Sequence, residues 1–303
     1  MLACLMHDLI ARGGSTMRIV LAVDGSDQSY YAARALEHLK QADKITALHA
    51  LDVPYPAFPM VMPEVAGDLY AVTEKRLREE GERVLKFVVS VLPPKTATVS
   101  TRLESGRPAE IILSVAGEEK ADMIVLGARG LGPVKELLLG SVSHRVLAHA
   151  PCPTLIVNRA LESLRHILLP VQGPEDAEAA IRFLTTKPFQ EPGEVTVLST
   201  EPFAQSPWLI DASVAESVTQ QIRQSAQRFV EDTAARLTAL GYRATPVVRT
   251  EAPGAAILNQ AEAAKSDLIL MGSRGLEGVS RFLLGSVSHT VLHRAPCPVL
   301  IFR

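Results

Sequence analysis

Short apolar runs alternate with longer amphipathic stretches along the whole chain. Runs such as IVLAV (19–23) and DMIVLG (122–127) have the length and near-continuous apolar character of strands buried on both faces. The stretches between them, such as 64–91, repeat their apolar positions with the period of a helix. The first half predicts strands at 19–23, 45–51, 98–103, 122–127 and 154–158, and helices at 27–41, 64–91, 108–119 and 141–149.

The second half follows the same order. It predicts strands at 167–171, 195–200, 244–249, 267–272 and 299–302, with a long helix at 213–240. Strands that alternate with helices favour a parallel sheet with helices on both faces. We therefore expect an α/β fold of two doubly wound, five-stranded, Rossmann-like domains at 17–158 and 163–303. Residues 1–16 are expected to lie outside the fold.

The chain contains an internal sequence repeat. GARGLGPVKELLLGSVSH (127–144) returns as GSRGLEGVSRFLLGSVSH (272–289), and 20 of the 31 aligned positions of 127–157 and 272–302 are identical. The starts of the two halves, MRIVLAVDGSDQS and RHILLPVQGPEDA, match more weakly. Self-similarity on this scale predicts two domains of one fold, derived from a duplicated unit.

Composition narrows the class of protein. The 303 residues are 47% hydrophobic and 21% charged, which favours a packed globular protein, and a net charge of −2 gives no footprint of nucleic-acid binding. No apolar run approaches the roughly 18 residues that a membrane helix needs. The three cysteines, Cys4, Cys152 and Cys297, are too sparse for a disulfide framework or a zinc site, so a cytoplasmic location is expected. Cys152 and Cys297 are expected to be small buried residues.

The glycines of the repeated segment suit an anion site. Gly127 closes an apolar strand at the edge where such sheets bind ligands, and Gly130 allows a second tight bend. Gly140 and Ser141 then open a helix, whose free N–H groups and dipole attract anions. The second copy offers Gly272, Gly275, Gly285 and Ser286, and further contacts are expected from Arg129, Ser143, Arg274 and Ser288.

Other interpretations of the glycines stay open at this point. Glycines at strand ends and helix starts often serve only turns, and a duplication would preserve them for packing alone. Three common motifs are absent from the sequence: G-x-x-x-x-G-K-[ST] of phosphate-binding loops, G-x-G-x-x-G after the first strand, and the G-x-S-x-G nucleophile elbow.

The full spacing resembles a known signature. Gly127-x-x-Gly130, nine residues, then Gly140-Ser141 is similar to the ATP-binding signature of the universal stress protein family, and the second copy satisfies it too. The tails APCPTLIV and APCPVLIF resemble the closing strand of that family. The resemblance covers about 17–158 and 163–303 and points to the branch with two tandem domains. It implies an ATP-binding protein of the stress response.

The resemblance also implies roles for individual residues of the first domain. Asp24 would contact the nucleoside end of ATP, and Ala50 would hold the adenine through its backbone. Leu126 and Gly127 would flank the ribose and phosphates. The phosphate loop would contain Gly130, Gly140, Ser141, Val142 and Ser143.

The second domain departs from this pattern at its first strand. Gln172 stands where the family has Asp, and Pro174 replaces the following Ser. Loss of a charge-assisted hydrogen bond would cost about 1–2 kcal/mol, or roughly tenfold in affinity. We therefore expect a stronger ATP site in the first domain and a weaker or altered one in the second. Its matching positions are Thr200, Met271, Gly272, Arg274, Gly275, Gly285, Ser286, Val287 and Ser288.

Three functions remain in view. The leading one is a nucleotide-dependent conformational signal, with Mg²⁺ or Mn²⁺ accompanying the triphosphate. The alternatives are a slow ATPase or self-phosphorylating enzyme, and an interaction scaffold with vestigial sites. The sequence offers no paired carboxylates or activated nucleophile, and His144 and His289 suit capping or packing better than catalysis.

The resemblance also bears on assembly and loops. Single-domain relatives pair through the closing strand, so 154–157 and 299–302 are expected to pair within one chain as a pseudo-dimer, and a further homodimer is expected. The proline-rich loop 53–63 is a candidate lid. The loop 202–210 with Trp208 either covers a ligand site or anchors itself.

Overall fold

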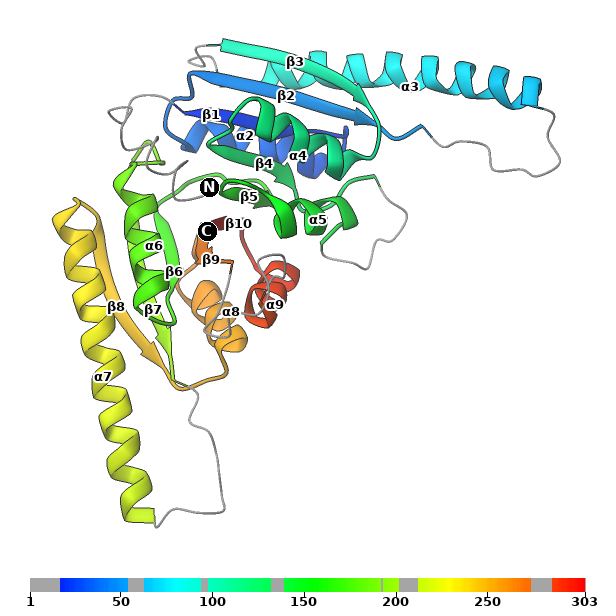
Figure 1. Ribbon diagram of the computed structural model, residues 1–303. Coiled ribbons are helices and arrows are strands. Elements are labelled where there is room, and N and C mark those ends of the chain that lie inside the picture. Colours follow the sequence, from blue (N-terminus) through cyan, green and yellow to red (C-terminus); the bar gives the residue numbers. More distant parts are fainter. Residues whose placement is uncertain are drawn as a thin grey trace. The chain divides into compact units, whose positions relative to one another are not determined.

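Strands paired in parallel and the helices between them form the framework of the described part of the protein (Figure 1). The computed structural model describes residues 17–53, 63–93, 98–131, 139–191, 193–201, 212–273 and 285–302. The chain divides into two compact units, Met1–Ala160 and Leu161–Arg303, called unit 1 and unit 2 below.

Unit 1 is a five-stranded α/β layer structure. Its strands lie in the order β3-β2-β1-β4-β5, and the pairs β1–β2, β2–β3, β1–β4 and β4–β5 are parallel. Helix α2 packs beside α3, and α4 packs beside α5, as expected when the two pairs cover opposite faces of a doubly wound sheet. The bounds are β1 Arg18–Ala22, α2 Asp27–Ala35, β2 Lys44–Leu51, α3 Pro63–Val91, β3 Thr98–Ser105, α4 Pro108–Glu118, β4 Met123–Gly127, α5 Ser141–His149 and β5 Thr154–Val157.

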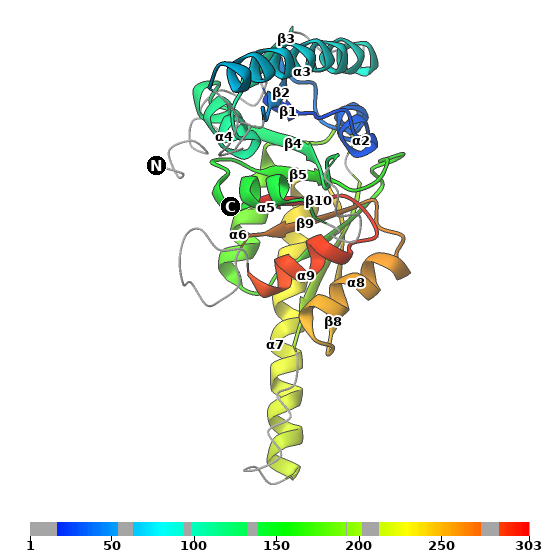
Figure 2. The ribbon, with the colours of Figure 1, turned by 90° about the vertical axis from the view of Figure 1, so that its right-hand side faces the viewer.

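Unit 2 repeats this plan. Its strands lie in the order β8-β7-β6-β9-β10, with parallel pairing throughout. Figure 2 shows α8 and α9 side by side, and these two helices contact each other as α4 and α5 do in unit 1. The bounds are β6 His166–Pro170, α6 Pro174–Thr185, β7 Glu194–Thr200, α7 Ala212–Ala239, β8 Arg243–Arg249, α8 Pro253–Ala263, β9 Leu268–Gly272, α9 Ser286–Arg294 and β10 Val299–Phe302.

Buried apolar strands form much of the core of each unit. Every residue of β4 is buried, and so is every residue of β5 and β10. Such strands contribute apolar side chains to both faces, which explains why their sequences read as continuous apolar runs. The expected α/β fold is therefore confirmed, and the predicted strands and helices lie close to the observed bounds. Cys152 and Cys297 are buried, as expected.

One helix is shorter than the amphipathic pattern predicted. The stretch 27–41 is α-helical only over α2 and then tightens into a 3₁₀ turn, η1, at Leu36–His38. The chain becomes extended at Leu39, whose side chain is 1% exposed. Burial of this leucine in the core thus ends the helix before its apolar periodicity does.

Some expectations fall outside the described residues. These are the placement of 1–16, most of the candidate lid 53–63, the loop 202–210 with Trp208, and the two site positions Arg274 and Gly275. None of the helices in the described part of the chain combines the length and apolar character needed to cross a membrane.

Candidate functional site

The carboxyl ends of β1 and β4 meet at the point where the strand order of unit 1 reverses. The two strands pair in parallel with Ala22 opposite Leu126. Asp24 follows β1 by two residues, and Gly127 is the last residue of β4. Ligands of open α/β sheets bind at this kind of reversal, so the fold brings Asp24 and the glycine loop to one place.

Asp24 is bound to the glycine loop. Its Oδ1 accepts hydrogen bonds from the backbone N–H of Ser26 at 3.0 Å and from Ser26 Oγ at 2.6 Å, and its Oδ2 accepts one from the N–H of Leu131 at 3.1 Å. The approach depends on Gly130, because a Cβ at that position would overlap Asp24 Oδ2. Glycine at 130 therefore serves a close contact between loop and carboxylate, beyond allowing a bend.

The first turn of α2 holds the other side of this loop. Ser26 caps α2 by accepting the N–H of Ser29, and its hydroxyl also lies 3.3 Å from the carbonyl oxygen of Arg129. Gln28 Oε1 accepts the N–H of Arg129 at 2.6 Å. A Cβ on Gly127 would lie 2.9 Å from the backbone carbon of Gln28, so α2 presses directly on the end of β4.

The start of α5 completes the site in unit 1. Gly140 is its N-cap, in an extended conformation with no side-chain cap, and its N–H donates to the carbonyl oxygen of Ala128 at 2.7 Å. A helix that begins without a side-chain cap leaves its first N–H groups for another acceptor. Ser141 is exposed and Val142 half-buried. Ser143 is buried and its hydroxyl donates to the Gly127 carbonyl oxygen at 2.8 Å, which fixes α5 to the end of β4.

The other predicted residues of unit 1 lie on neighbouring strands. Ala50 is half-buried near the end of β2, and Leu126 is buried in β4. Between them, His49 Nδ1 lies 2.8 Å from the carbonyl oxygen of Val23, just before Asp24. This contact ties β2 to the segment that carries Asp24.

Tyr30 lies near two carboxylates at the start of α2. Burial raises the pKa of Tyr30, and the negative charges of Asp24 and Asp27 raise it further. Its ring packs edge-on against Phe87 of α3, with centroids 4.8 Å apart. Asp24 and Asp27 thus place two negative charges at the start of α2.

Unit 2 keeps the frame of this site. Ser288 is buried, and its hydroxyl lies 3.3 Å from the carbonyl oxygen of Gly272, as Ser143 does with Gly127. Gly285 is the uncapped N-cap of α9, and its N–H points to the Ser273 carbonyl oxygen at 3.4 Å. Ser286 is exposed, Val287 and Thr200 are half-buried, and Met271 is buried.

Unit 2 differs at the start of its first helix. The Gln172 side chain is exposed, and its backbone N–H donates to Asp176 Oδ2 at 3.3 Å. Helix α6 begins after Gly173 with Pro174 and has no side-chain cap, whereas Ser26 caps α2. Within the described residues of unit 2, the bonds that Asp24 and Ser26 make in unit 1 are therefore not repeated.

Three residues whose contacts help to build the candidate sites were not identified from the sequence: Gln28, His49 and Asp176. A signal for two of them was present, since Gln28 and Asp176 align in the matched starts of the two halves but differ in charge. His144 and His289 are exposed on α5 and α9. The rings of His289 and His293 have centroids 4.3 Å apart and are tilted by 36°. In the described ranges no group of three or more His, Cys, Asp or Glu side chains gathers as a metal site would require.

Comparison with known proteins assigns the family. The family model of the universal stress protein family matches residues 16–158 and 163–303. A universal stress protein of Methanocaldococcus jannaschii is 34% identical over 155 residues, covering 50% of this chain and 88% of the relative. A universal stress protein of Mycobacterium tuberculosis is 27% identical over 298 residues, covering 94% of this chain and 96% of the relative.

A solved structure agrees in fold. The crystal structure of a universal stress protein from Archaeoglobus fulgidus superposes with a TM-score of 0.64 at 20% identity, covering 96% of this chain and 97% of the other. Two matched segments, a sheet order that occurs once in each unit and a relative similar over nearly the full length lead to one conclusion. The chain belongs to the universal stress protein family and carries two tandem domains of it.

Proposed function

We propose that the protein binds an adenine nucleotide, with ATP as the preferred ligand, at the carboxyl edge of the unit 1 sheet. The observation that carries this proposal is the start of α5, a glycine-led helix without a side-chain cap at the point where strand order reverses. The N–H groups of its first turn and its dipole form an anion site beside Gly127 and Gly130. The family resemblance names the anion as the phosphates of ATP.

The residues around this helix start fit such a ligand. Gly140 has room beside it, since a Cβ there would meet only ordinary contacts, the nearest with the Ala128 carbonyl oxygen at 3.4 Å. Ser141 offers an exposed hydroxyl. The Ser143 hydroxyl is already bound to Gly127, so Ser143 would serve phosphate through its backbone N–H. Mg²⁺ or Mn²⁺ would be held mainly by phosphate oxygens and water.

The nucleoside end is assigned to the neighbouring strand ends. Ala50 near the end of β2 would meet the adenine through its backbone, and Asp24 would meet the nucleoside, as the resemblance implies. Asp24 also binds Leu131, so a ligand that engages Asp24 acts on the glycine loop. Nucleotide binding would thereby change the surface formed by the loop and α5, and a protein partner would recognise that change as a signal.

The site of unit 2 is proposed as the weaker one. Its α9 start and the bond between Ser288 and Gly272 match unit 1. Its first helix lacks the serine cap, and Gln172 takes the place of Asp24. The two sites of one chain would then respond to different nucleotide concentrations.

A single substitution tests the anion site without weakening the helix. Gly140→Asp places a favoured N-cap residue at a position whose φ of −73° and ψ of 157° any residue can adopt. The new carboxylate would cap the first turn of α5 and repel phosphate. We expect ATP affinity to fall at least tenfold by isothermal titration calorimetry, while Tm stays equal or rises.

Two controls make this test decisive. Gly140→Ala adds a Cβ without charge and should change ATP affinity far less than Gly140→Asp. Adenosine carries no phosphate, so its affinity should be nearly the same in all three proteins. Unchanged ATP binding by Gly140→Asp would show that the start of α5 is not the phosphate site.

A further inference from the structure

The two units carry a carboxylic acid and an amide side chain at the same two positions, but in opposite order. In unit 1, Asp24 follows the first strand and Gln28 lies in the first turn of the next helix; in unit 2, Gln172 and Asp176 hold those positions in the reverse order. At these two positions each unit thus has one carboxylate and one carboxamide. The negative charge is in a different place in each.

In unit 1 a neutral side chain lies at the strand-end glycine. A Cβ on Gly127 would lie 2.9 Å from the backbone carbon of Gln28 and 3.0 Å from its Cβ, and Gln28 Oε1 accepts the N–H of Arg129. The Asp24 carboxylate lies farther along the loop, bound to Ser26 and Leu131. The end of β4, where the phosphate-binding turn is anchored, therefore adjoins an amide.

In unit 2 a carboxylate lies at the strand-end glycine. Asp176 Oδ2 accepts the N–H of Gln172 just beyond β6, and Asp176 Oδ1 is 3.0 Å from where a Cβ on Gly272 would lie. The carboxylate thus spans the ends of β6 and β9 and is half-buried. The Gly272 carbonyl oxygen accepts from Ser288 in the first turn of α9, so Asp176 lies beside the residue to which the start of α9 is bound.

We propose that Asp176 makes unit 2 select adenine ligands by their phosphate charge, favouring the nucleoside and monophosphate over the triphosphate. This inference rests on the proposed nucleotide sites. A fixed negative charge beside the phosphate-binding turn repels a ligand in proportion to the ligand's own charge and leaves neutral adenosine unaffected. Asp176 is thus a specificity-determining residue, and unit 2 responds to the dephosphorylated end of the adenine nucleotide pool.

Hydrogen–deuterium exchange on the full chain measures ligand protection of both proposed sites in the same sample. Protection of peptides covering 140–147 and 285–292 is followed as ATP, AMP or adenosine is titrated, with EDTA present so that no divalent cation neutralises the phosphates. We expect unit 2 to require about tenfold more ATP than adenosine for half-protection. Unit 1 has the neutral Gln28 in place of Asp176 and should show a smaller penalty, so it serves as the internal reference.

Two variants isolate the charge. Asp176→Asn keeps the shape and removes the charge, and Asp176→Gln supplies the residue found in unit 1. Both should lower the ATP concentration needed by unit 2 about tenfold while leaving its adenosine response and all of unit 1 unchanged. Higher salt should shrink the difference between the wild type and Asp176→Asn, because screening weakens a charge effect and not a packing effect.

Each failure has a distinct meaning. If neither unit is protected by any ligand, the proposed function itself is wrong. If unit 1 is protected and Asp176→Asn shifts ATP and adenosine equally, or shifts neither, the role of Asp176 in charge selection is refuted. That role is also refuted if unit 2 remains unprotected in the wild type and in both variants, since the carboxylate would then not be what excludes ATP.

Discussion

At the scale of single residues, the candidate site of unit 1 depends on the absence of side chains at two glycines. A side chain at Gly130 would collide with Asp24, and one at Gly127 would collide with the start of α2. The spacing of these glycines was visible in the sequence, but their partners were not. Contacts such as Gln28 with Arg129 and His49 with Val23 join segments far apart in the chain, so only the fold identifies them.

Gly130→Ala is expected to weaken ATP binding with little loss of stability. The added Cβ displaces the Asp24 carboxylate from Leu131, but Gly130 is exposed and lies outside any helix or strand. We expect roughly a tenfold loss of ATP affinity in calorimetry, in line with loss of a charge-assisted hydrogen bond. Gly117→Ala is the matched control: nothing lies within 4 Å of its Cβ position in α4, so affinity should not change and Tm should rise slightly. Equal affinities of Gly130→Ala and wild type would contradict the role given to this contact.

Ser26→Ala is expected to cost stability as well as affinity. Ser26 caps α2, donates to Asp24 and contacts the Arg129 carbonyl oxygen. Loss of a serine N-cap costs about 1–2 kcal/mol, which should lower Tm by several degrees in thermal melts followed by circular dichroism. Ser90→Ala removes an exposed hydroxyl that donates to the carbonyl oxygen of Phe87 and should barely change Tm. A Tm loss no larger than that of the control would show that the cap contributes little.

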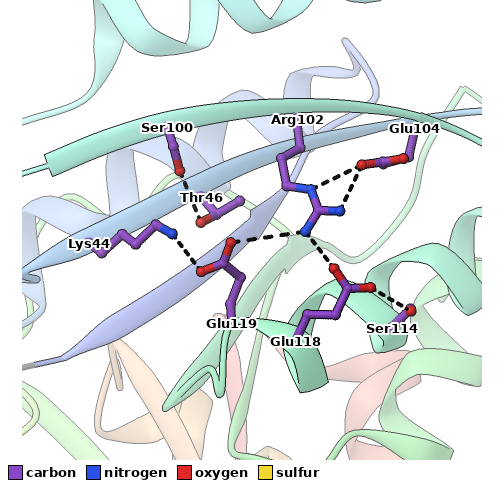
Figure 3. A network of polar contacts seen from close by, with 8 residues as sticks. All are labelled: Lys44, Thr46, Ser100, Arg102, Glu104, Ser114, Glu118 and Glu119. Carbon is purple, nitrogen blue, oxygen red and sulfur yellow. Dashed lines mark hydrogen bonds and ion pairs between the residues drawn. The ribbon is translucent and has the colours of Figure 1, made fainter.

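At the scale of elements, an ionic network ties the edge strand β3 to the end of α4 in unit 1 (Figure 3). Arg102 of β3 binds Glu104 at 2.8 Å and Glu118 at 2.8 Å, and Lys44 of β2 binds Glu119 at 2.6 Å. Ser114 adds a hydrogen bond to Glu118. Side chains of three elements thus hold a strand that has a neighbour on only one side within its unit.

The network predicts an acid-sensitive contribution to stability. Hydrogen bonds from Arg102 and Ser114 lower the pKa of Glu118, so folding favours its charged form. A lowered pKa in the folded state stabilises the protein above the unfolded value, about 4.5, and this contribution is lost as pH falls through the folded value. The stability difference between wild type and Arg102→Gln should therefore be largest near neutral pH and shrink below pH 4.5.

Urea denaturation of wild type and Arg102→Gln at neutral and acid pH measures this difference. At neutral pH we expect a small but measurable loss of stability in Arg102→Gln, because the pairs are partly exposed and water screens them. Arg107→Gln is the control, since the side chain of Arg107 is 75% exposed in its pair with Glu110. A difference that stays constant with pH would mean that packing of the Arg102 side chain, and not its charge, supports β3.

Element boundaries show what periodicity can and cannot predict. Strands β4, β5, β9 and β10 were predicted to within a residue, because continuous apolar runs are long enough to define a buried strand. Helix α2 ends earlier than predicted because Leu39 is buried in the core, and the local sequence pattern does not reveal this tertiary contact. The sequence showed that Ser26 precedes α2 and that Pro174 begins α6. It did not show that α2 would have a side-chain cap and that α6 would lack one.

At the scale of the whole molecule, duplication gives one chain two units whose proposed ligand edges differ in chemistry. The frame of strand order, uncapped helix start and buried serine is common to both units. The residues that surround the ligand edge differ, as the exchange of Asp24 and Gln28 for Gln172 and Asp176 shows. Pairing of 154–157 with 299–302 as a pseudo-dimer, and the domain limits 17–158 and 163–303, stay predictions at this scale.

Assembly into a further homodimer is also a prediction. Size-exclusion chromatography with light scattering should give twice the 32.7 kDa mass of one chain. A mass of one chain across the micromolar range would refute the homodimer.

The most direct test of the account is native mass spectrometry of the full chain with increasing ATP and Mg²⁺. We predict that one ATP per chain binds first, that Gly140→Asp removes this adduct, and that the matched Gly285→Asp in unit 2 leaves it in place. Absence of any adduct at millimolar ATP, or loss of the first adduct in Gly285→Asp instead of Gly140→Asp, would contradict a nucleotide site at the carboxyl edge of unit 1.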